Sequence, residues 1–271
     1  MTAALWLLSC ATIIIMRTAL LYILFVTAPA AALLGTRLTH CLELAERPFA
    51  DGTKPHGLVA DIGCDHGYLA AELAHRGRTV AAVDVAEAPL DGCRRHFAER
   101  GLEPAAYVLG DGVAAVQADA SLGYCETAIV AGVGPRTASA VVDGACAGPE
   151  PPPRRFVLQP AQCWIGNMRS LRETLANNGY GVAEERWLDD NGPNQRPNGR
   201  RLLVTIRADR DAAAAPSETE LLVGLPSADA ARSSYVKHHA QWVEDVANHP
   251  RDSRKRREAA RWLPLLRSAL L

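Results

Sequence analysis

Short apolar runs alternate with amphipathic segments along the chain from residue 57 onward. Seven runs rich in Val, Ile, Leu and Ala have the length of β-strands, at 57–62, 79–84, 105–109, 126–131, 155–159, 180–187 and 201–207. Segments with helical periodicity lie between most of them, at 67–76, 87–100, 136–143 and 164–178. Because neighbouring parallel strands need a crossover helix, this alternation predicts a mostly parallel sheet with helices on both faces.

The last two strand-like runs break this alternation. A segment rich in Gly, Pro and Asn, residues 191–199, joins them without a helix. Such a connection predicts an antiparallel pair at the edge of the sheet. The predicted fold class is therefore α/β, with seven strands.

The two ends of the chain differ from this α/β region. After an Ala/Asp linker at 209–216, helical segments follow at 218–223, 230–247 and 253–270. Residues 3–35 carry one charged side chain, Arg17, among apolar and small residues. We therefore divide the chain into an apolar leader or membrane anchor (1–35), an α/β domain (36–208) and a helical C-terminal domain (209–271).

The apolar N-terminal segment can be interpreted in three ways. A basic start at Met16-Arg17, an apolar core and small residues at 30–32 favour a cleaved leader. A membrane span and a misassigned gene start are the alternatives. Contact with a membrane is expected only if the segment is retained.

Composition narrows the function further. The chain of 271 residues is 48% hydrophobic and has a formal net charge of −1, so contact with nucleic acid would need a local basic face. Its seven cysteines are scattered and never form Cys-x-x-Cys. This pattern favours reduced thiols in an intracellular compartment and disfavours a zinc site. We expect no metal.

A glycine loop follows the first predicted strand. It reads Asp61-Ile-Gly63-Cys-Asp-His-Gly67 and leads into a helical segment. Glycines there let the backbone turn with positive φ and let a ligand approach the main chain at the carboxyl end of the strand. The spacing differs from Gly-x-Gly-x-x-Gly, so NAD is disfavoured. The loop resembles the first motif of S-adenosyl-L-methionine (SAM)-dependent methyltransferases.

Two acidic residues stand where such a cofactor would need them. Asp84 ends the second strand, seventeen residues after Gly67, and could accept both ribose O–H groups. Asp111 lies between Gly110 and Gly112 after the third strand, where it could reach an adenine amino group. For both, a turn residue without a ligand is the alternative.

Four further segments carry a more specific resemblance. They are Asp65-His66 within the glycine loop, Ala131-Gly132-Val133-Gly134-Pro135, Gln159-Pro160, and a helix that ends Asn178-Gly179-Tyr180. Together they resemble the bacterial tRNA (adenine-N1)-methyltransferase family that modifies adenosine 22. The resemblance covers about residues 37–271.

This resemblance implies a Rossmann-like seven-stranded methyltransferase sheet with a small all-helical C-terminal appendage, SAM as cofactor and tRNA as partner. It implies that the cofactor lies on Asp61, Gly63, Gly67, Asp84, Asp111 and Gly132, and the substrate near Gln159 and Pro160. Asp65 is the candidate to stabilise positive charge on the methylated base, and His66 to orient Asp65 or contact phosphate. A hydrogen-bonded network that only orders the loop is the alternative for both.

The chemistry expected of adenine N1 agrees with these residue types. The ring nitrogen has an in-plane lone pair, so alignment can replace a strong base. The chain has no Asp/Asn-Pro-Pro-Tyr after the fourth strand, the motif expected of enzymes that methylate exocyclic amines. In folded tRNA the base would have to be flipped out to reach the pocket.

Three departures from the family pattern put the substrate in doubt. Cys64 replaces a serine, Pro135 replaces a glycine, and the loop 189–200 is longer and rich in Arg and Asn. A SAM-dependent enzyme for a small molecule, or a catalytically weakened RNA-binding protein, are therefore the alternatives.

The C-terminal helical segment offers a basic face for RNA. Arg254, Lys255, Arg256 and Arg257 follow one another there, and could bind phosphate with salt-sensitive affinity. A solvated helix face is the alternative. A tRNA substrate implies an intracellular protein, in a plastid or mitochondrion if the leader is real and otherwise in the cytoplasm.

Overall fold

The computed structural model describes residues 34–190, 202–212, 215–248 and 253–270. The chain divides into two units, Met1–Gly35 and Thr36–Leu271, and everything below concerns the second. The expected leader or anchor and most of the 189–200 loop lie outside the described residues. In the part of the chain that is described, no helix is both long and apolar enough to cross a membrane.

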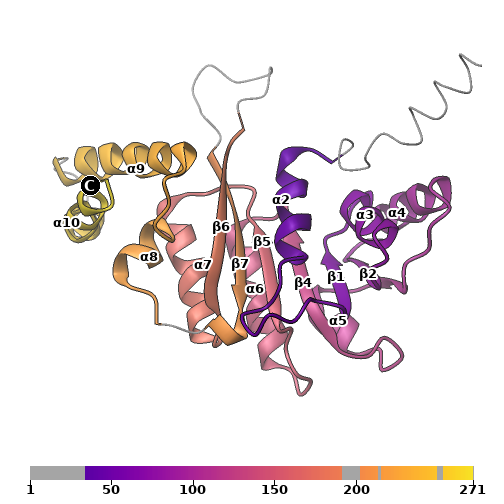
Figure 1. Ribbon diagram of the computed structural model, residues 1–271. Helices are drawn as coiled ribbons and strands as arrows, with labels where there is room; N and C mark the ends of the chain where they lie inside the picture. The colour runs from indigo at the N-terminus through magenta and orange to yellow at the C-terminus, as the bar shows by residue number, and fades with distance from the viewer. Residues whose placement is uncertain (1–33, 191–201, 213–214, 249–252, 271) are drawn as a thin grey trace, which may run out of the picture. The chain divides into compact units, whose positions relative to one another are not determined.

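A seven-stranded sheet organises the second unit (Figure 1). The strands are β1 (Leu58–Ile62), β2 (Val80–Asp84), β3 (Ala106–Leu109), β4 (Cys125–Ala131), β5 (Arg155–Gln159), β6 (Gly181–Asp189) and β7 (Leu202–Asp209). Their order is β3-β2-β1-β4-β5-β7-β6, and β7 runs antiparallel to both β5 and β6. The predicted fold class, a Rossmann-like methyltransferase sheet with an antiparallel edge pair, is confirmed.

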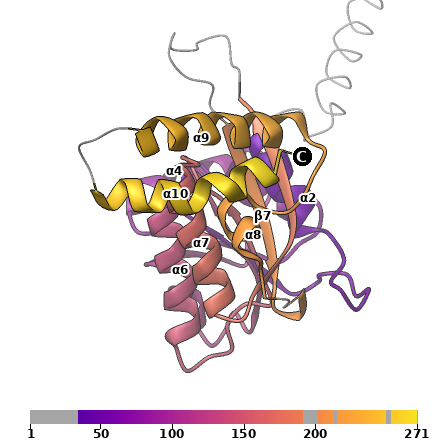
Figure 2. The ribbon, with the colours of Figure 1, turned by 90° about the vertical axis from the view of Figure 1, so that its left-hand side faces the viewer.

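Helices cover both faces of this sheet. The helices that precede β6 are α2 (Thr36–Ala45), α3 (Tyr68–His75), α4 (Glu87–Glu99), α5 (Gly112–Gln117), α6 (Pro135–Ala147) and α7 (Ile165–Asn177). Figure 2 shows α6 and α7 on one side of the sheet and α2 on the other. The central strands β1, β2 and β5 are buried along their whole length, because both faces are covered.

The C-terminal helices pack onto the β6–β7 side of the sheet. They are α8 (Glu218–Val223), α9 (Ala230–Asn248) and α10 (Ser253–Ser268). Helix α8 contacts α7, α9 contacts β6 and β7, and α10 packs against α9 (Figures 1 and 2). The expected all-helical appendage is therefore present and joined to the sheet.

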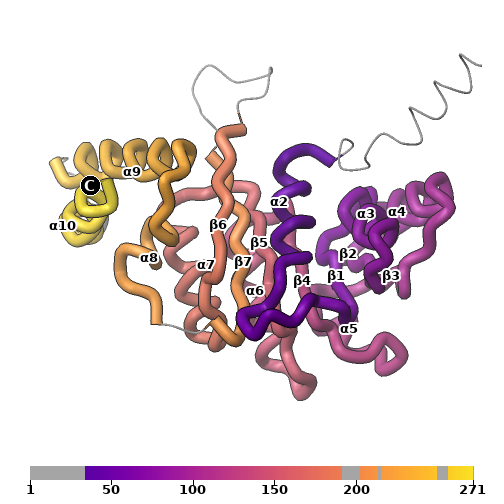
Figure 3. Tube along the Cα trace, viewed as in Figure 1, coloured from indigo at the N-terminus to yellow at the C-terminus, as the bar shows by residue number. Residues whose placement is uncertain are grey.

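A buried ion pair fixes the end of α2. Arg155 of β5 is fully buried, and its Nε and Nη2 donate to the carboxylate of Asp209 at 2.6 and 2.9 Å. Its Nη1 donates to the carbonyl of Ala45, at the last residue of α2, at 3.1 Å. Because α2 runs along the sheet beside β4 and β5 (Figure 3), this anchor sets where the first residues of α2 lie.

A second buried ion pair attaches α8. Arg172 of α7 and Glu185 of β6 are each 2% exposed, and the Arg172 Nε donates to Glu185 Oε1 at 2.9 Å. The same guanidinium donates to the carbonyl of Leu221, while Glu185 accepts the N–H of Leu225. Between them lies Gly224, where a Cβ would lie 1.8 Å from the Glu185 carboxylate. The polar groups at the end of α8 are thus satisfied by side chains of α7 and β6.

Two features of the fold were not predicted from the sequence. Helix α5, between β3 and β4, is only six residues long and has no distinct apolar stripe. Pro135, which replaces a glycine of the family pattern, is the first residue of α6 and not part of the loop after β4. A helix has no intrahelical acceptor for an N–H at that position, so proline fits there without cost.

Candidate active site

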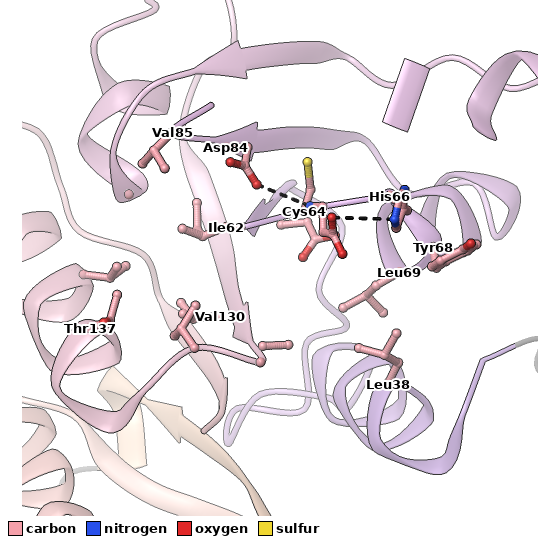
Figure 4. Close-up of a pocket in the computed structure, with 18 of the residues that line it drawn as sticks. Leu38, Ile62, Cys64, His66, Tyr68, Leu69, Asp84, Val85, Val130 and Thr137 are labelled. Carbon is pink, nitrogen blue, oxygen red and sulfur yellow. Dashed lines mark hydrogen bonds and ion pairs between the residues drawn. The ribbon is translucent and has the colours of Figure 1, made fainter. Parts of the chain in front are cut away.

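A pocket of about 530 Å³ opens at the carboxyl ends of β1, β2, β3 and β4 (Figure 4). The loops that follow these four strands line it, and the first turn of α2 completes it. All six residues predicted to bind the cofactor lie in the pocket region, and Asp61, Gly63, Asp84, Asp111 and Gly132 line it directly. The crossover connections bring these loops together because the strands that they follow are parallel.

The glycine loop after β1 has the backbone that the sequence predicted. Gly67 has φ +70°, and a Cβ there would lie 2.3 Å from the Cys93 Sγ of α4. Only glycine therefore allows the loop to approach α4 so closely. Within the same loop Asp65 has φ +49°, the only positive φ of a non-glycine residue in the described ranges. A strained backbone of this kind is typical of functional loops.

Asp61 lies at the floor of the pocket. Its carboxyl is 3% exposed, and burial raises its pKa to about 7, with a smaller contribution from the negative charge of Asp84. A backbone hydrogen bond from Ala70, in the first turn of α3, acts in the opposite direction. Asp61 thus ties the glycine loop to the helix that follows it.

Asp84 has the position and the free acceptors needed to bind a ligand. Its Oδ2 accepts the N–H of Asp65 at 3.4 Å and its Oδ1 that of Ala86 at 3.1 Å. Each carboxylate oxygen can accept a further hydrogen bond. The next residue, Val85, lines the pocket with 69% of its surface exposed, which provides an apolar wall beside the carboxylate.

Asp65 and His66 both line the pocket, and Figure 4 shows the His66 side chain beside Tyr68. Their side chains are 73% and 59% exposed, and Asp65 Oδ1 lies 3.9 Å from His66 Nε2. The His66 ring packs near Tyr68, and a Cβ on Gly92 of α4 would come within 3.0 Å of His66 Nδ1. The imidazole is thus placed by α4, while the carboxylate of Asp65 is open to an incoming ligand.

Arg37 is a pocket residue that the sequence reasoning missed. Its Nη1 donates to Gln159 Oε1 at 2.7 Å, and Gln159 Nε2 donates to the Pro160 carbonyl at 2.7 Å. Gln159 is fully buried, so its amide holds Arg37 instead of facing the pocket. Gly132 has φ +81°, and a Cβ there would lie 3.2 Å from Arg37 Nη1, so glycine makes room for the guanidinium. Arg37 and Gln159 are 122 residues apart, so no local sequence pattern could predict their contact.

The other predicted substrate residues do not line this pocket. Pro160 is buried next to Gln159. Arg256 and Arg257 are exposed near the start of α10, and the side chains of Arg254 and Lys255 lie outside the described set. Contact of any of these residues with RNA stays a prediction.

The described residues contain no group of three or more His, Cys, Asp or Glu side chains that could hold a metal ion. Six of the seven cysteines fall within that part of the chain, and all six are free thiols. Burial raises the pKa of the Cys41 and Cys125 thiols to about 12, so both are held in the neutral form.

Comparison with solved structures establishes the fold. M. capricolum TrmK, in complex with S-adenosyl-homocysteine, aligns with a TM-score of 0.69 and 15% identity over 88% of this chain and 97% of its own. A Streptococcus pneumoniae protein described as a candidate tRNA (m1A22) methyltransferase, in complex with SAM, aligns with a TM-score of 0.68 and 18% identity over 88% of this chain and 100% of its own.

Curated relatives match only locally. The ubiquinone biosynthesis O-methyltransferase of Stutzerimonas stutzeri is 49% identical over 45 residues, and that of Azotobacter vinelandii is 47% identical over 45 residues. The match covers 17% of this chain and 19% of either relative, so the chain spans about a fifth of their length.

A family model described as a methyltransferase domain matches residues 48–194. The match includes the glycine loop, Asp84, Asp111 and the strands β1 to β6. Since it spans more than half of the chain, and the pocket has the glycine loop and carboxylates described above, the chain belongs to the methyltransferase domain family.

Proposed function

We propose that this protein transfers the methyl group of SAM to N1 of an adenine in tRNA. The observation that carries the proposal is the likeness of the fold over 88% of the chain, including its C-terminal helices, to proteins described as tRNA (m1A22) methyltransferases. The exposed carboxylate of Asp65 in the pocket lining supports it, because the methylated base is cationic.

The pocket fits SAM by the chemistry of its walls. Asp84 would accept the ribose hydroxyls, Val85 would contact the adenine face, and Asp111 would accept from the adenine amino group. The backbone of the 61–67 loop would hold the amino-acid end. When bound there, SAM supplies an electrophilic methyl group. The volume of about 530 Å³ is within the range of small-molecule sites.

The protein's own task is then alignment and electrostatics. Adenine N1 needs no base to expose its lone pair, so the main demand is to hold the ring in line with the methyl group. Asp65 would stabilise the positive charge that develops on the ring. The ion pair that anchors α2 and the Arg37–Gln159 hydrogen bond keep the opposite wall of the pocket in place.

Methylation of a small molecule is the second candidate function, because the local curated matches are O-methyltransferases of ubiquinone biosynthesis. A small-molecule enzyme would more often close its pocket with a helical lid. In the described structure the pocket lining comes from α2 and the strand-end loops, whereas α9 lies against β6 and β7. This placement favours a large substrate.

Mass spectrometry of nucleosides tests the proposal. Unmodified tRNA transcripts are incubated with the full chain and SAM, and digested to nucleosides. We expect 1-methyladenosine, and its loss when Asp84→Ala replaces the wild type. Absence of any methylated nucleoside, together with SAM-dependent methylation of a phenolic quinone precursor, would establish the small-molecule function instead. Binding of tRNA without SAM binding would indicate a protein that keeps only the fold.

A further inference from the structure

A second hollow lies on the same edge of the sheet, on the other side of β5. Its volume is about 300 Å³. Its walls are the segment 161–164 after β5, the first residues of β7, and the face of α9 that carries Tyr235, His238 and His239. In Figure 1, α9 lies near the upper end of β6 and β7, and the first residues of α2, which line the cofactor pocket, lie at the same end of the sheet. We call this hollow the α9 cleft.

One thin wall separates the α9 cleft from the cofactor pocket. The N–H of Ala161, which lines the cleft, donates to the carbonyl of Val133, which lines the pocket, at 2.8 Å. The N–H of Gly132 donates to the carbonyl of Gln159 at 2.9 Å. The cleft and the cofactor pocket are therefore neighbours across a single layer of backbone.

The cleft presents an aromatic ring in a fixed orientation. Trp164 is 39% exposed, although tryptophans in a protein of this size are mostly buried. Trp242 of α9 packs edge-on against it with ring centroids 4.5 Å apart and an interplanar angle of 78°. The His239 ring also packs against the indole, with centroids 5.2 Å apart, so two rings fix its orientation while 39% of the residue stays exposed. An exposed indole in a fixed orientation is the kind of group on which a base can stack.

His239 secures this arrangement and is not itself a ligand group. Its Nε2 accepts the N–H of Ile165, the first residue of α7, at 3.3 Å, so its proton is on Nδ1, which donates to the Tyr235 carbonyl at 3.0 Å. Burial lowers the pKa of His239 to about 4, which keeps the ring neutral. Lys237 is exposed next to it on α9 and supplies a positive charge beside the cleft.

Tyr235 forms a wall of the cleft. It lines the cleft, is 1% exposed, and its phenolic oxygen is buried without a hydrogen-bond partner among the described residues. The flat faces of nucleobases stack on indole, which suits the exposed ring of Trp164 beside this wall.

We propose that the α9 cleft binds a second nucleobase of the RNA, from a nucleotide next to the target adenine, stacked on Trp164. The inference rests on the proposed function, since it assumes an RNA substrate. The positive charge of Lys237 beside the cleft suits the phosphates that flank such a base. The cleft would hold the neighbouring nucleotide while the target base occupies the cofactor pocket.

Three variants of the full chain test this inference. Trp164→Leu keeps apolar volume against Trp242 but removes the stacking platform, and Trp164→Phe retains an aromatic face. The matched control is Tyr124→Leu, because Tyr124 is 49% exposed and lies just before β4, at the opposite edge of the sheet. We expect Trp164→Leu to raise KM for tRNA about 5- to 100-fold, the range for losing one stacked base. Trp164→Phe should stay within about threefold of wild type, in keeping with the retained platform.

A tRNA with an abasic site on either side of the target adenine gives the second measurement. Removal of the base that occupies the cleft should lower kcat/KM for the wild type but not for Trp164→Leu, because the two changes remove the same contact. The SAM dissociation constant, measured by calorimetry, should be the same in all variants, which shows that the fold is intact.

The outcomes separate the two proposals. If the wild type does not methylate tRNA, the proposed function fails and the inference falls with it. If the wild type methylates tRNA but Trp164→Leu behaves like Tyr124→Leu, only the inference is overturned. Additive losses from Trp164→Leu and from each abasic site would also overturn it. If Trp164→Leu loses SAM binding, the abasic substrates are tested on Trp164→Phe instead. This variant keeps an aromatic face, so one of the two abasic sites should still lower its kcat/KM. If neither site lowers it, the stacking is contradicted.

Discussion

The two halves of the carboxyl edge of the sheet contain different types of residue. The half formed by the loops after β1 to β4 is acidic and glycine-rich, with Asp61, Asp65, Asp84 and Asp111 around one pocket. The half formed by β5, β7 and α9 is aromatic and basic, with Trp164, Tyr235 and the exposed Lys237 and His238. One half suits a cofactor with hydroxyl and ammonium donors, and the other suits bases and phosphates.

The difference teaches how each half is specified. The cofactor half depends on short loops whose backbone conformation follows from their own residues, such as Gly67 and Asp65. The other half depends on helices that are held by distant partners, such as the Arg172–Glu185 pair and the His239–Ile165 hydrogen bond. Mutations should therefore affect the two halves separately.

Breaking the buried pair that attaches α8 should have the largest effect. We expect Arg172→Met to lower the free energy of unfolding by about 3–5 kcal/mol, because it leaves the Glu185 charge buried without its partner. Urea denaturation measures this loss. The control is Arg94→Met, whose ion pairs with Glu87 and Asp91 are exposed to solvent, so its loss should hardly change the free energy of unfolding.

Folded Arg172→Met protein should still bind SAM with wild-type affinity, as calorimetry below the unfolding transition can show. A large loss of SAM affinity in that variant would show that the two halves are coupled, and would contradict the comparison.

Asp65→Asn should lower kcat by about 10²-fold, the scale for losing one group that stabilises charge in the transition state. Single-turnover methylation of tRNA measures this change. SAM affinity should hardly change, because the Asp65 side chain is exposed and it is its backbone N–H that contacts Asp84. Asp91→Asn, on the exposed face of α4, is the control. Equal losses in turnover and SAM affinity would move Asp65 into the cofactor site.

Asp84→Ala should raise the SAM dissociation constant more than about tenfold. Hydrogen bonds to a charged acceptor contribute about 1.5–3 kcal/mol, and every 1.4 kcal/mol is tenfold in affinity. Calorimetry on the purified variant measures it. Asp84→Asn, which keeps one acceptor oxygen, should lie between the alanine variant and the wild type. A change within about twofold for Asp84→Ala would show that the ribose assignment is wrong.

The smallest effect is expected at the start of α10. Replacing Arg256 and Arg257 with Ala should weaken tRNA binding and flatten its salt dependence, by about 0.7–0.9 in log–log slope for each lost phosphate contact. Filter binding at several salt concentrations measures the slope. The control is the same replacement at Arg94 and Arg95 on α4. An unchanged slope for α10 would leave the α9 side of the sheet as the RNA surface.

Much of the cofactor half could be predicted from the sequence. Apolar periodicity gave all seven strands to within two residues. The signal is strongest for β1, β2 and β5, because burial on both faces demands continuous apolar runs. The glycine loop, Asp84 and Asp111 followed from local spacing, since glycine takes the positive φ of Gly67 without strain.

Tertiary structure decided the rest. It brought Arg37 to the pocket and turned the side-chain amide of Gln159 toward the Arg37 guanidinium, although the two residues are 122 positions apart in the sequence. It placed Pro135 at the start of α6, where its missing N–H has no cost. It also set Trp242 of α9 against Trp164, where it helps to fix the orientation of an exposed indole. Each of these outcomes depends on which elements the folded chain packs together, and residue spacing carries information only about contacts within a turn, a helix or a strand.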